Sequence, residues 1–223
     1  MLYIKKLFRE NKGFLAFLLG MLLFRSAVAD WYVVPSSSMY PTLLIGDHVV
    51  ANRLAYDVKL PFSDVILKHI ADPVRGDVVT FISPADGIRL VKRLVAVPGD
   101  VVEMRDEKLI INGAELAYQP LTSYVALTPD YAGRQLALNE DLLGKNHGIL
   151  EMPERSAIRS FGPIKVPEDQ YLMLGDNRDN SADSRYIGFV KRELITGRVQ
   201  HVLYSLDEKN HYLPRLNRIY LVL

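Results

Sequence analysis

Two hydrophobic patterns divide the chain. The segment FLAFLLGMLLF, from Phe14 to Phe24, contains no charged residue, and further apolar residues continue to Val34. A helix that crosses a bilayer needs about 20 such residues, and charged side chains such as Arg25 and Asp30 are tolerated near its ends. We therefore predict an N-terminal transmembrane helix over residues 13–34, preceded by a short basic segment over residues 1–12.

The same segment has the features of a cleavable leader. It ends in Ala27-Val28-Ala29, which is typical of a site cut during secretion, and basic residues precede it: Lys5, Lys6, Arg9 and Lys12. For a leader and for an anchor alike, the basic flank stays in the cytoplasm and the residues after Val34 lie outside. Hydropathy alone leaves both alternatives open.

After Pro35 the pattern changes to that of β-strands. Short runs rich in Val, Ile and Leu alternate with Gly, Pro and Asp, as strands and their turns do. These runs cover residues 47–58, 76–83, 88–97, 100–116, 169–176 and 197–206. Asn112-Gly113 is a strong signal for a hairpin turn. Residues 191–195 are expected to form a single helical turn at most.

Residues from about 118 to 167 differ from the rest of this region. Longer polar connections and mixed charges replace the strand pattern, so we expect an inserted lobe over 118–167. The fold predicted for the domain of residues 35–223 is therefore mainly β, with antiparallel sheets in a barrel-like core.

Composition excludes several classes of function. The 223 residues include 27 basic and 26 acidic ones, a balance that does not favour nucleic-acid binding. The absence of cysteine removes disulfides, thiolate–zinc sites and cysteine nucleophiles. The histidines lack metal-ligand spacing, and a calcium loop starting at Asp179 would lack its glycine and its glutamate. We expect no metal and no organic cofactor.

Lys92 stands at an unusual place in the strand pattern. In the run IRLVKRLVAV, alternation puts Leu90, Lys92 and Leu94 on one face. One interpretation is a lysine near a sheet edge whose stem packs while its ammonium reaches water. The other is a buried lysine, in which desolvation lowers the pKa and leaves an amine that accepts a proton near neutral pH. Such an amine would be a general base without a histidine.

A general base needs a nucleophile, and the segment PSSSMYPTL offers three neighbouring hydroxyl groups. A serine run is ordinarily a loop or a helix cap. Here Pro35 and Pro41 stiffen the segment, and Met39 and Leu43 can anchor it against apolar surroundings. These features favour a nucleophile on a fixed turn.

The loop GDNRDNSADSRYIG, residues 175–188, concentrates polar residues. A solvated turn would have such a composition. The interleaving of Arg178 and Arg185 with three aspartates favours instead a network of ion pairs and hydrogen bonds that holds a loop rigid beside a site.

Together these stretches resemble bacterial type I signal peptidases. The resemblance rests on four blocks in order: PSSSMYPTLLIGD, RGDVVTF, VKRLVAVPGD and GDNRDNSADSRYIGFV. The stretch FRSAVADWYVV also resembles the family's junction between membrane segment and catalytic domain. The blocks cover most of the predicted core, whereas the inserted lobe is only loosely similar.

The resemblance implies a serine–lysine dyad. Ser38 is then the nucleophile and Lys92 its general base. The hydroxyl of Ser36 and the backbone N–H of Ser38 form the oxyanion hole, where loss of one donor costs about 100- to 1,000-fold in rate. Ser181 hydrogen-bonds to the Lys92 amine and orients it. Two ion pairs support the site: Asp183 with Arg185, and Asp176 with Arg93.

The substrates implied by the resemblance are exported preproteins, cut after small-x-small motifs such as Ala-x-Ala. An extended peptide presents alternate side chains, so two shallow apolar pockets would select small residues, with Met39 and Leu43 as candidate walls. Such an enzyme belongs in the bacterial cytoplasmic membrane, single-pass, with its catalytic domain outside. This favours a retained anchor, with occasional self-cleavage after Ala27-Val28-Ala29 as a hypothesis. The sequence does not specify an oligomeric state.

Two alternatives remain open. The first is a specialised relative that processes one dedicated exported substrate. The second is an inactive, membrane-tethered peptide-binding protein that uses the same groove, although a binder needs no amine beside a hydroxyl. A self-cleaving repressor also uses a serine–lysine dyad, but it would need a DNA-binding domain that the short basic segment cannot hold.

Overall fold

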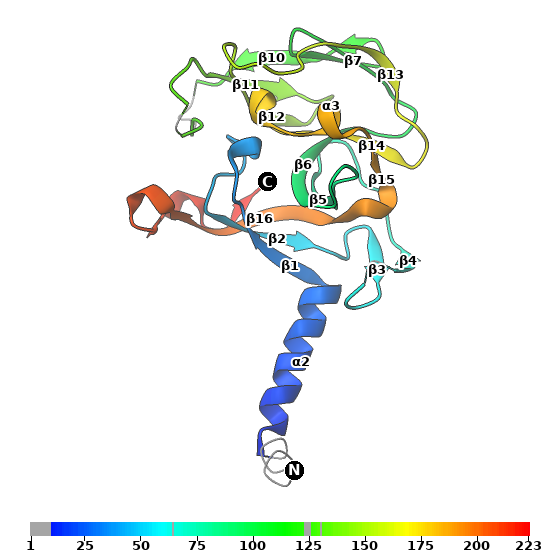
Figure 1. Cartoon of the computed structure of the whole chain (residues 1–223), viewed down its shortest axis with the longest axis vertical. Helices are drawn as coiled ribbons and strands as arrows, with labels where there is room; N and C mark the ends of the chain where they lie inside the picture. The colour runs from blue at the N-terminus through cyan, green and yellow to red at the C-terminus, as the bar shows by residue number, and fades with distance from the viewer. Residues whose placement is uncertain (1–9, 64, 123–125, 130) are drawn as a thin grey trace.

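The computed structural model describes residues 10–63, 65–122, 126–129 and 131–223. In this part of the chain, the helix α2 (Lys12–Ala27) projects from a body built of β-strands (Figure 1). No residue of α2 is buried, and the side chains of Phe14 and Phe17 are 61% and 65% exposed. Within the described ranges, no helix combines the length and the apolar character needed to cross a membrane.

The helix ends earlier than the hydrophobic pattern predicted. Ala29–Val33 form strand β1, which pairs antiparallel with β2 (Asp47–Asn52), so a helix up to Val34 is wrong for these residues. Buried Asp30 alternates with exposed Trp31, which is the period of a strand. The Asp30 carboxylate also accepts hydrogen bonds from Arg25 at 2.9 Å and from Tyr32 at 2.5 Å, tying the last turn of α2 to β1.

The largest sheet has nine strands in the order β1-β2-β16-β5-β6-β14-β15, with β17 and β18 paired to β16. The further strands are β5 (Val78–Ile82), β6 (Arg89–Ala96), β14 (Gln170–Leu174), β15 (Val190–Lys191), β16 (Ile195–Asp207), β17 (Leu213–Pro214) and β18 (Leu221–Val222). Neighbouring strands are antiparallel, which confirms the predicted mainly β, antiparallel fold.

The sheet curls, so that β6 returns towards β1 although the two strands are not paired. The guanidinium of Arg89 lies 3.6 Å from the Asp30 carboxylate and 5.0 Å from the centre of the Tyr32 ring. The sheet is thus curled like a barrel but stays open, because β1 and β6 are not paired by backbone hydrogen bonds.

The second part of the body begins before residue 118, where the inserted lobe was expected. Strand β7 pairs with β13 rather than with the large sheet, which moves the start of this part to Val101. Its strands are β7 (Val101–Arg105), β8 (Lys108–Ile111), β9 (Ala114–Glu115), β10 (Ala117–Pro120), β11 (Leu136–Asp141), β12 (Asn146–Glu151) and β13 (Phe161–Lys165). They form one sheet of order β13-β7-β8-β9 and another of order β10-β11-β12, above the large sheet in Figure 1. The predicted turn at Asn112-Gly113 is confirmed, with φ angles of 53° and 81° between β8 and β9.

Short elements complete the body. The helical turns are η1 (Ser37–Met39), η2 (Arg178–Asn180), α3 (Ser184–Ile187), η3 (Arg192–Leu194), η4 (Glu208–Asn210) and η5 (Leu216–Arg218). The turn η3 agrees with the single turn predicted within residues 191–195. A separate two-stranded ribbon, β3 (Asp57–Lys59) with β4 (Ile66–His69), lies beside the upper end of α2 in Figure 1.

Candidate active site

Ser38 is held on the tight turn η1, between β1 and β2. The turn is anchored by Met39 and Leu43, which are 1% and 0% exposed in an apolar cluster with Val49 and Val199. Both side chains belong to the core, and their packing fixes the position of Ser38. Their role as walls of a substrate pocket stays a prediction.

Lys92 reaches Ser38 from strand β6. The two residues are 54 positions apart in the sequence, yet Nζ of Lys92 donates to Oγ of Ser38 at 2.7 Å. Lys92 is 3% exposed, so the buried interpretation of this lysine describes the structure and the edge interpretation does not. The sheet thus places an amine and a hydroxyl in the contact that a base and its nucleophile need.

The environment of Lys92 shifts its amine towards the neutral form. Burial lowers the pKa of Lys92 from its ordinary value of 10.5 to about 8, although Asp183 and Asp176 oppose this shift. Desolvation penalises a buried ammonium because the surrounding protein solvates the charge less well than water does. A substantial fraction of the amine is therefore neutral near pH 8, as proton transfer from Ser38 requires.

Ser36 lies beside the dyad. Its Oγ is 3.3 Å from Oγ of Ser38, and it makes no capping hydrogen bond although Ser36 occupies the N-cap position of η1. The cap interpretation of the serine run thus does not describe this side chain. A hydroxyl so close to the nucleophile is within reach of an oxygen bound to the attacked carbon.

The loop of residues 175–188 contains the ion pair predicted between Asp183 and Arg185. The Arg185 guanidinium donates two hydrogen bonds to Asp183, at 2.9 and 2.8 Å, and both side chains are fully buried. Asp183 also accepts from the backbone N–H of Gly175 at 3.0 Å. These contacts tie the two parts of the loop to each other through charge-assisted hydrogen bonds.

The ion pair predicted between Arg93 and Asp176 is bidentate. Nε and Nη2 of Arg93 donate to the two carboxylate oxygens at 2.8 and 2.7 Å, and Thr42 donates to the same carboxylate. Burial alone would raise the pKa of Asp176, but the Arg93 guanidinium holds this pKa below its ordinary value. The pair joins β6, the loop and the segment that follows Ser38.

Ser181 departs from its predicted role. Its hydroxyl is buried and forms no hydrogen bond with the described residues, while the Lys92 amine donates to Ser38. The hydroxyl faces Gly175 instead: a Cβ added to this glycine would lie 2.2 Å from Ser181 Oγ and 2.6 Å from the Ser38 carbonyl oxygen. The predicted Ser181–Lys92 hydrogen bond is therefore not formed in this structure.

Two asparagines of the same loop position the nucleophile, and sequence reasoning missed them. The side chain of Asn177 donates to the Ser37 carbonyl at 2.9 Å, and that of Asn180 donates to the Ser37 hydroxyl at 2.8 Å. Both the carbonyl and the hydroxyl of Ser37 thus bind the loop. The only sequence signal was that these amides flank Arg178 in a polar loop.

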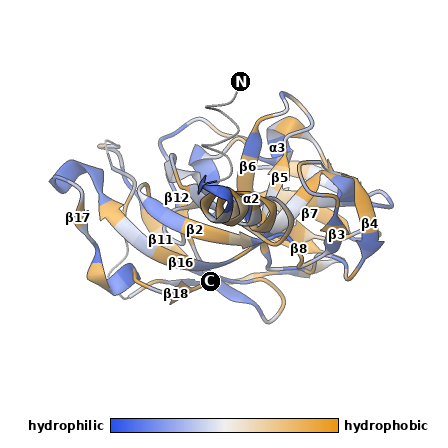
Figure 2. Cartoon of the chain, turned by 90° about the horizontal axis from the view of Figure 1, so that it is seen from below, coloured by the Kyte–Doolittle hydropathy of each residue, from blue (hydrophilic) through white to orange (hydrophobic). Residues whose placement is uncertain are grey.

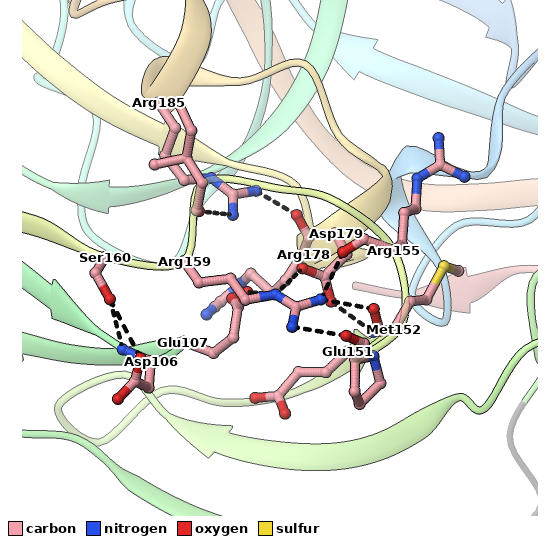
Figure 3. A network of polar contacts seen from close by, with 12 residues as sticks. Asp106, Glu107, Glu151, Met152, Arg155, Arg159, Ser160, Arg178, Asp179 and Arg185 are labelled. Atoms are coloured by element: carbon pink, nitrogen blue, oxygen red, sulfur yellow. Dashed lines mark hydrogen bonds and ion pairs between the residues drawn. The ribbon is translucent and has the colours of Figure 1, made fainter.

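Further buried charged residues form hydrogen bonds with η2. Arg178 donates to Glu140 at 2.7 Å, and Asp179 accepts hydrogen bonds from the Met152 N–H and from Arg159 (Figure 3). Burial, followed by the neighbouring Asp179, raises the pKa of Glu107 to about 8. This network lies behind the loop and does not include Ser38 or Lys92.

One cleft of the described structure does not have the dyad in its lining. It has a volume of about 940 Å³ and is lined by residues that include Pro41, Arg93, His147 and Leu221, but not by Ser38 or Lys92. Burial, followed by repulsion from Arg93, lowers the pKa of His147 to about 4, so this imidazole is neutral at neutral pH. Across the described ranges, no three His, Asp or Glu side chains form a group suited to a metal ion.

A serine on a rigid turn, hydrogen-bonded to a buried lysine of lowered pKa, is the arrangement of a serine hydrolase that uses lysine as its base. Comparison with known families agrees, because residues 9–204 match the model of the signal peptidase, peptidase S26 family. The chain belongs to this family.

Curated relatives cover nearly the whole chain. Signal peptidase I of Pseudomonas fluorescens is 36% identical over 225 residues, which cover 95% of this chain and 78% of that protein. Signal peptidase I of Pseudomonas aeruginosa is 35% identical, with 94% and 77% covered. Signal peptidase I T of Bacillus subtilis is 32% identical, with 89% and 86% covered.

Proposed function

We propose that this protein is a membrane-anchored serine endopeptidase that removes signal peptides from exported preproteins after small-x-small motifs. Its family and the names of its relatives support the reaction. The single observation that carries the mechanism is the hydrogen bond of 2.7 Å between Lys92 Nζ and Ser38 Oγ.

The catalytic cycle begins with a neutral Lys92. Its amine takes the proton of the Ser38 hydroxyl while Oγ attacks the scissile carbonyl carbon. The Ser36 hydroxyl and the Ser38 N–H donate to the oxygen that becomes negative. The protonated Lys92 then gives its proton to the leaving amine, and an acyl-enzyme remains. Neutral Lys92 next takes a proton from water, which attacks the ester carbon. Lys92 returns this proton to Ser38 Oγ as the ester bond breaks, which releases the second product and restores Ser38 and neutral Lys92.

The substrate peptide binds as an added strand between β1 and β6. These strands are not paired with each other, yet Arg89 of β6 reaches Asp30 of β1. An extended peptide in this gap would form backbone hydrogen bonds and present alternate side chains to the sheet. Partly buried Tyr32 and Val91, which pack on the core beneath Ser38, are suited to form shallow apolar walls for small residues.

The anchor is the exposed, apolar segment that includes α2. Its sequence from Phe14 to Phe24 carries no charge, and basic residues precede it. This charge distribution keeps the N-terminus in the cytoplasm and puts the β body on the outer face of the bacterial cytoplasmic membrane. The dyad then acts on preproteins as they emerge on that face.

Cleavage of a detergent-solubilised preprotein with an Ala-x-Ala site tests the proposal. We expect Ser38→Ala and Lys92→Met to lose at least about 10⁴-fold in kcat/KM, since a nucleophile and its base act as one unit. Lys191→Met is the matched control, because the side chain of Lys191 is 65% exposed. This control should cleave like the wild type.

The outcome separates the alternatives. Wild-type cleavage of several unrelated preproteins supports a general signal peptidase, whereas cleavage of one alone indicates a dedicated enzyme. A wild type that binds preproteins and never cleaves them indicates a peptide-binding protein. Brisk cleavage by folded Lys92→Met would overturn the assignment of the base.

A further inference from the structure

The hairpin between β7 and β8 carries a buried glutamate in an unfavourable backbone conformation. Its turn consists of Asp106 and Glu107, whose φ angles are 43° and 70°. Two-residue hairpin turns with positive φ at both positions favour Asn-Gly, which the next hairpin has at Asn112-Gly113. A glutamate at the glycine position is strained, and strain of this kind is concentrated at functional sites. The conformation therefore favours a role for the Glu107 side chain.

Glu107 belongs to the buried network of Figure 3. The residue is 5% exposed, and neither carboxyl oxygen accepts a hydrogen bond from the described residues. Nε of Arg159 lies 3.2 Å from Oε1 of Glu107, but its N–H donates to Oδ1 of Asp179 at 3.0 Å. Oδ2 of Asp179 accepts from the Met152 N–H at 2.6 Å. A buried carboxylate without a donor is costly, whereas a proton on Glu107 removes the charge and supplies a donor to Asp179.

The charged groups around Glu107 agree with a neutral acid. Burial, followed by the hydrogen bond with Asp179, raises the pKa of Glu107 to about 8. The guanidinium groups of Arg185 and Arg178 oppose this shift. Together with Arg159, these are the charged groups that face Glu107 from η2, from α3 and from the segment before β13. At neutral pH the Glu107 carboxyl group is therefore mainly protonated.

The middle residue of η2 connects this pair of carboxyl groups to the nucleophile. Asp179 lies between Asn177 and Asn180, whose side-chain amides bind the carbonyl and the hydroxyl of Ser37. The backbone N–H of Asn177 also donates to the Ser38 carbonyl at 3.1 Å. A displacement of η2 would therefore displace the turn that carries Ser38.

We propose that Glu107 is a positioning residue for the cleavage reaction: its neutral carboxyl group donates to Asp179 and fixes η2 against the turn of Ser38. This inference rests on the proposed function. Above pH 8, where Glu107 ionises, the Arg159 guanidinium lies between the two carboxylates and keeps them joined. The contact thus persists at the pH where Lys92 is neutral.

Substitutions at Glu107 test the positioning with a preprotein in detergent. Glu107→Gln keeps a donor of similar shape, so this variant should cleave at close to the wild-type rate. Glu107→Ala and Glu107→Gly remove the donor, and we expect kcat to fall about 10- to 100-fold. KM should stay nearly unchanged, because the displaced nucleophile lies outside the gap that binds the peptide.

Two other glutamates provide matched controls. Glu103 lies in the same hairpin and accepts from the exposed side chain of Arg105, so Glu103→Ala should retain wild-type kcat. Glu208→Ala changes an exposed carboxyl group in η4, next to β17. Figure 2 shows β17 at the opposite side of the body from β7 and β8. Losses in these controls equal to that of Glu107→Ala would overturn the specific role of Glu107.

Glycine and alanine at position 107 separate positioning from stability. Glycine adopts a φ of 70° without strain, so Glu107→Gly should have a higher thermal midpoint than Glu107→Ala. Equal losses of kcat in these two variants would support the positioning role. Activity that follows the thermal midpoint, or a Glu107→Gln variant as slow as Glu107→Ala, would overturn it.

The proton on Glu107 has a readout that does not require cleavage. Between its ordinary pKa of 4.5 and about 8, the folded chain binds more protons than the unfolded chain, so stability falls as pH rises through this window. The thermal midpoint of Glu107→Gln should therefore gain several degrees on that of the wild type across the window. A constant difference would overturn the hydrogen bond to Asp179. A wild type that shows this pH dependence but cleaves no preprotein would overturn the proposed function and the positioning role, and leave the hydrogen bond.

Discussion

Lys92 and Arg93 are neighbours in β6, but the two faces of this strand give them opposite environments. On one face, the Lys92 amine meets a hydroxyl and no carboxylate within hydrogen-bond distance among the described residues. On the other, the Arg93 guanidinium meets Asp176 in paired hydrogen bonds. Both cations are nearly covered, at 3% and 7% exposure. Burial therefore accompanies a lysine of lowered pKa, the proposed base, on one face and a structural ion pair on the other.

The difference shows how the site keeps its lysine reactive. Asp183 and Asp176 both raise the pKa of Lys92, against the larger effect of burial. Each of these carboxylates is engaged by an arginine, Arg185 or Arg93. The arginines thus partly neutralise the charges that would otherwise hold Lys92 in its protonated form.

Removal of the ion pair between Arg93 and Asp176 should have the largest effect on the free energy of unfolding. Arg93→Met leaves the Asp176 carboxylate buried without its cation, and we expect a loss of about 3–5 kcal/mol in the free energy of unfolding. Urea denaturation measures this loss. The matched control is Arg89→Met, because Arg89 is 38% exposed and its contact to Asp30 is 3.6 Å long. A loss of less than about 1 kcal/mol for Arg93→Met would show that the two faces do not differ in this way.

Removal of the Lys92 ammonium should change the free energy of unfolding in the opposite direction. Lys92→Met deletes a buried ammonium and keeps an apolar stem, so we expect the unfolding free energy to rise by about 1–3 kcal/mol at neutral pH. The pKa of Lys92 is about 8 in the folded protein and 10.5 ordinarily, so the unfolded chain binds more protons between these values. Wild-type stability should therefore rise with pH across this window, and the advantage of the variant should disappear above it. A variant that is less stable than the wild type at pH 7 would contradict this account.

The smallest effect is the pH dependence of the wild-type reaction. With neutral Lys92 as the proposed base, kcat/KM should rise about tenfold per pH unit below pH 8 and level off above it. His147→Gln is the control, since the pKa of His147 is already lowered to about 4 and its titration lies outside this range. A midpoint of kcat/KM near pH 6.5 that is absent from His147→Gln would show that a histidine, and not Lys92, controls the pH dependence.

Local patterns in the sequence predicted several elements of the structure. Alternation in β6 separated Lys92 from Arg93, and the interleaved charges of residues 175–188 predicted a network of ion pairs in that loop. The two named pairs, Asp183 with Arg185 and Asp176 with Arg93, came from the resemblance to a family. The Asn112-Gly113 turn followed from backbone preferences alone. The pairing of Ser38 with Lys92 came from resemblance to a family, since no local rule connects residues 54 positions apart.

Other features depended on which segments meet in space. The hydropathy pattern did not indicate that the residues after Ala27 pair with β2, or that β7 pairs with β13. The sequence showed that Met39 and Leu43 are apolar, but not that both pack in the core below Ser38. The amides of Asn177 and Asn180 became positioning groups only when their loop packed against Ser37.

By itself, the sequence determined the chemical groups available, their alternation along strands and the places where the chain turns. These properties follow from residue type and from backbone geometry over a few neighbours. The tertiary structure decided which groups lost their water and which partners replaced it. Desolvation depends on every segment packed around a side chain. For that reason only the folded chain lowers the pKa of Lys92 and makes Arg93 half of an ion pair.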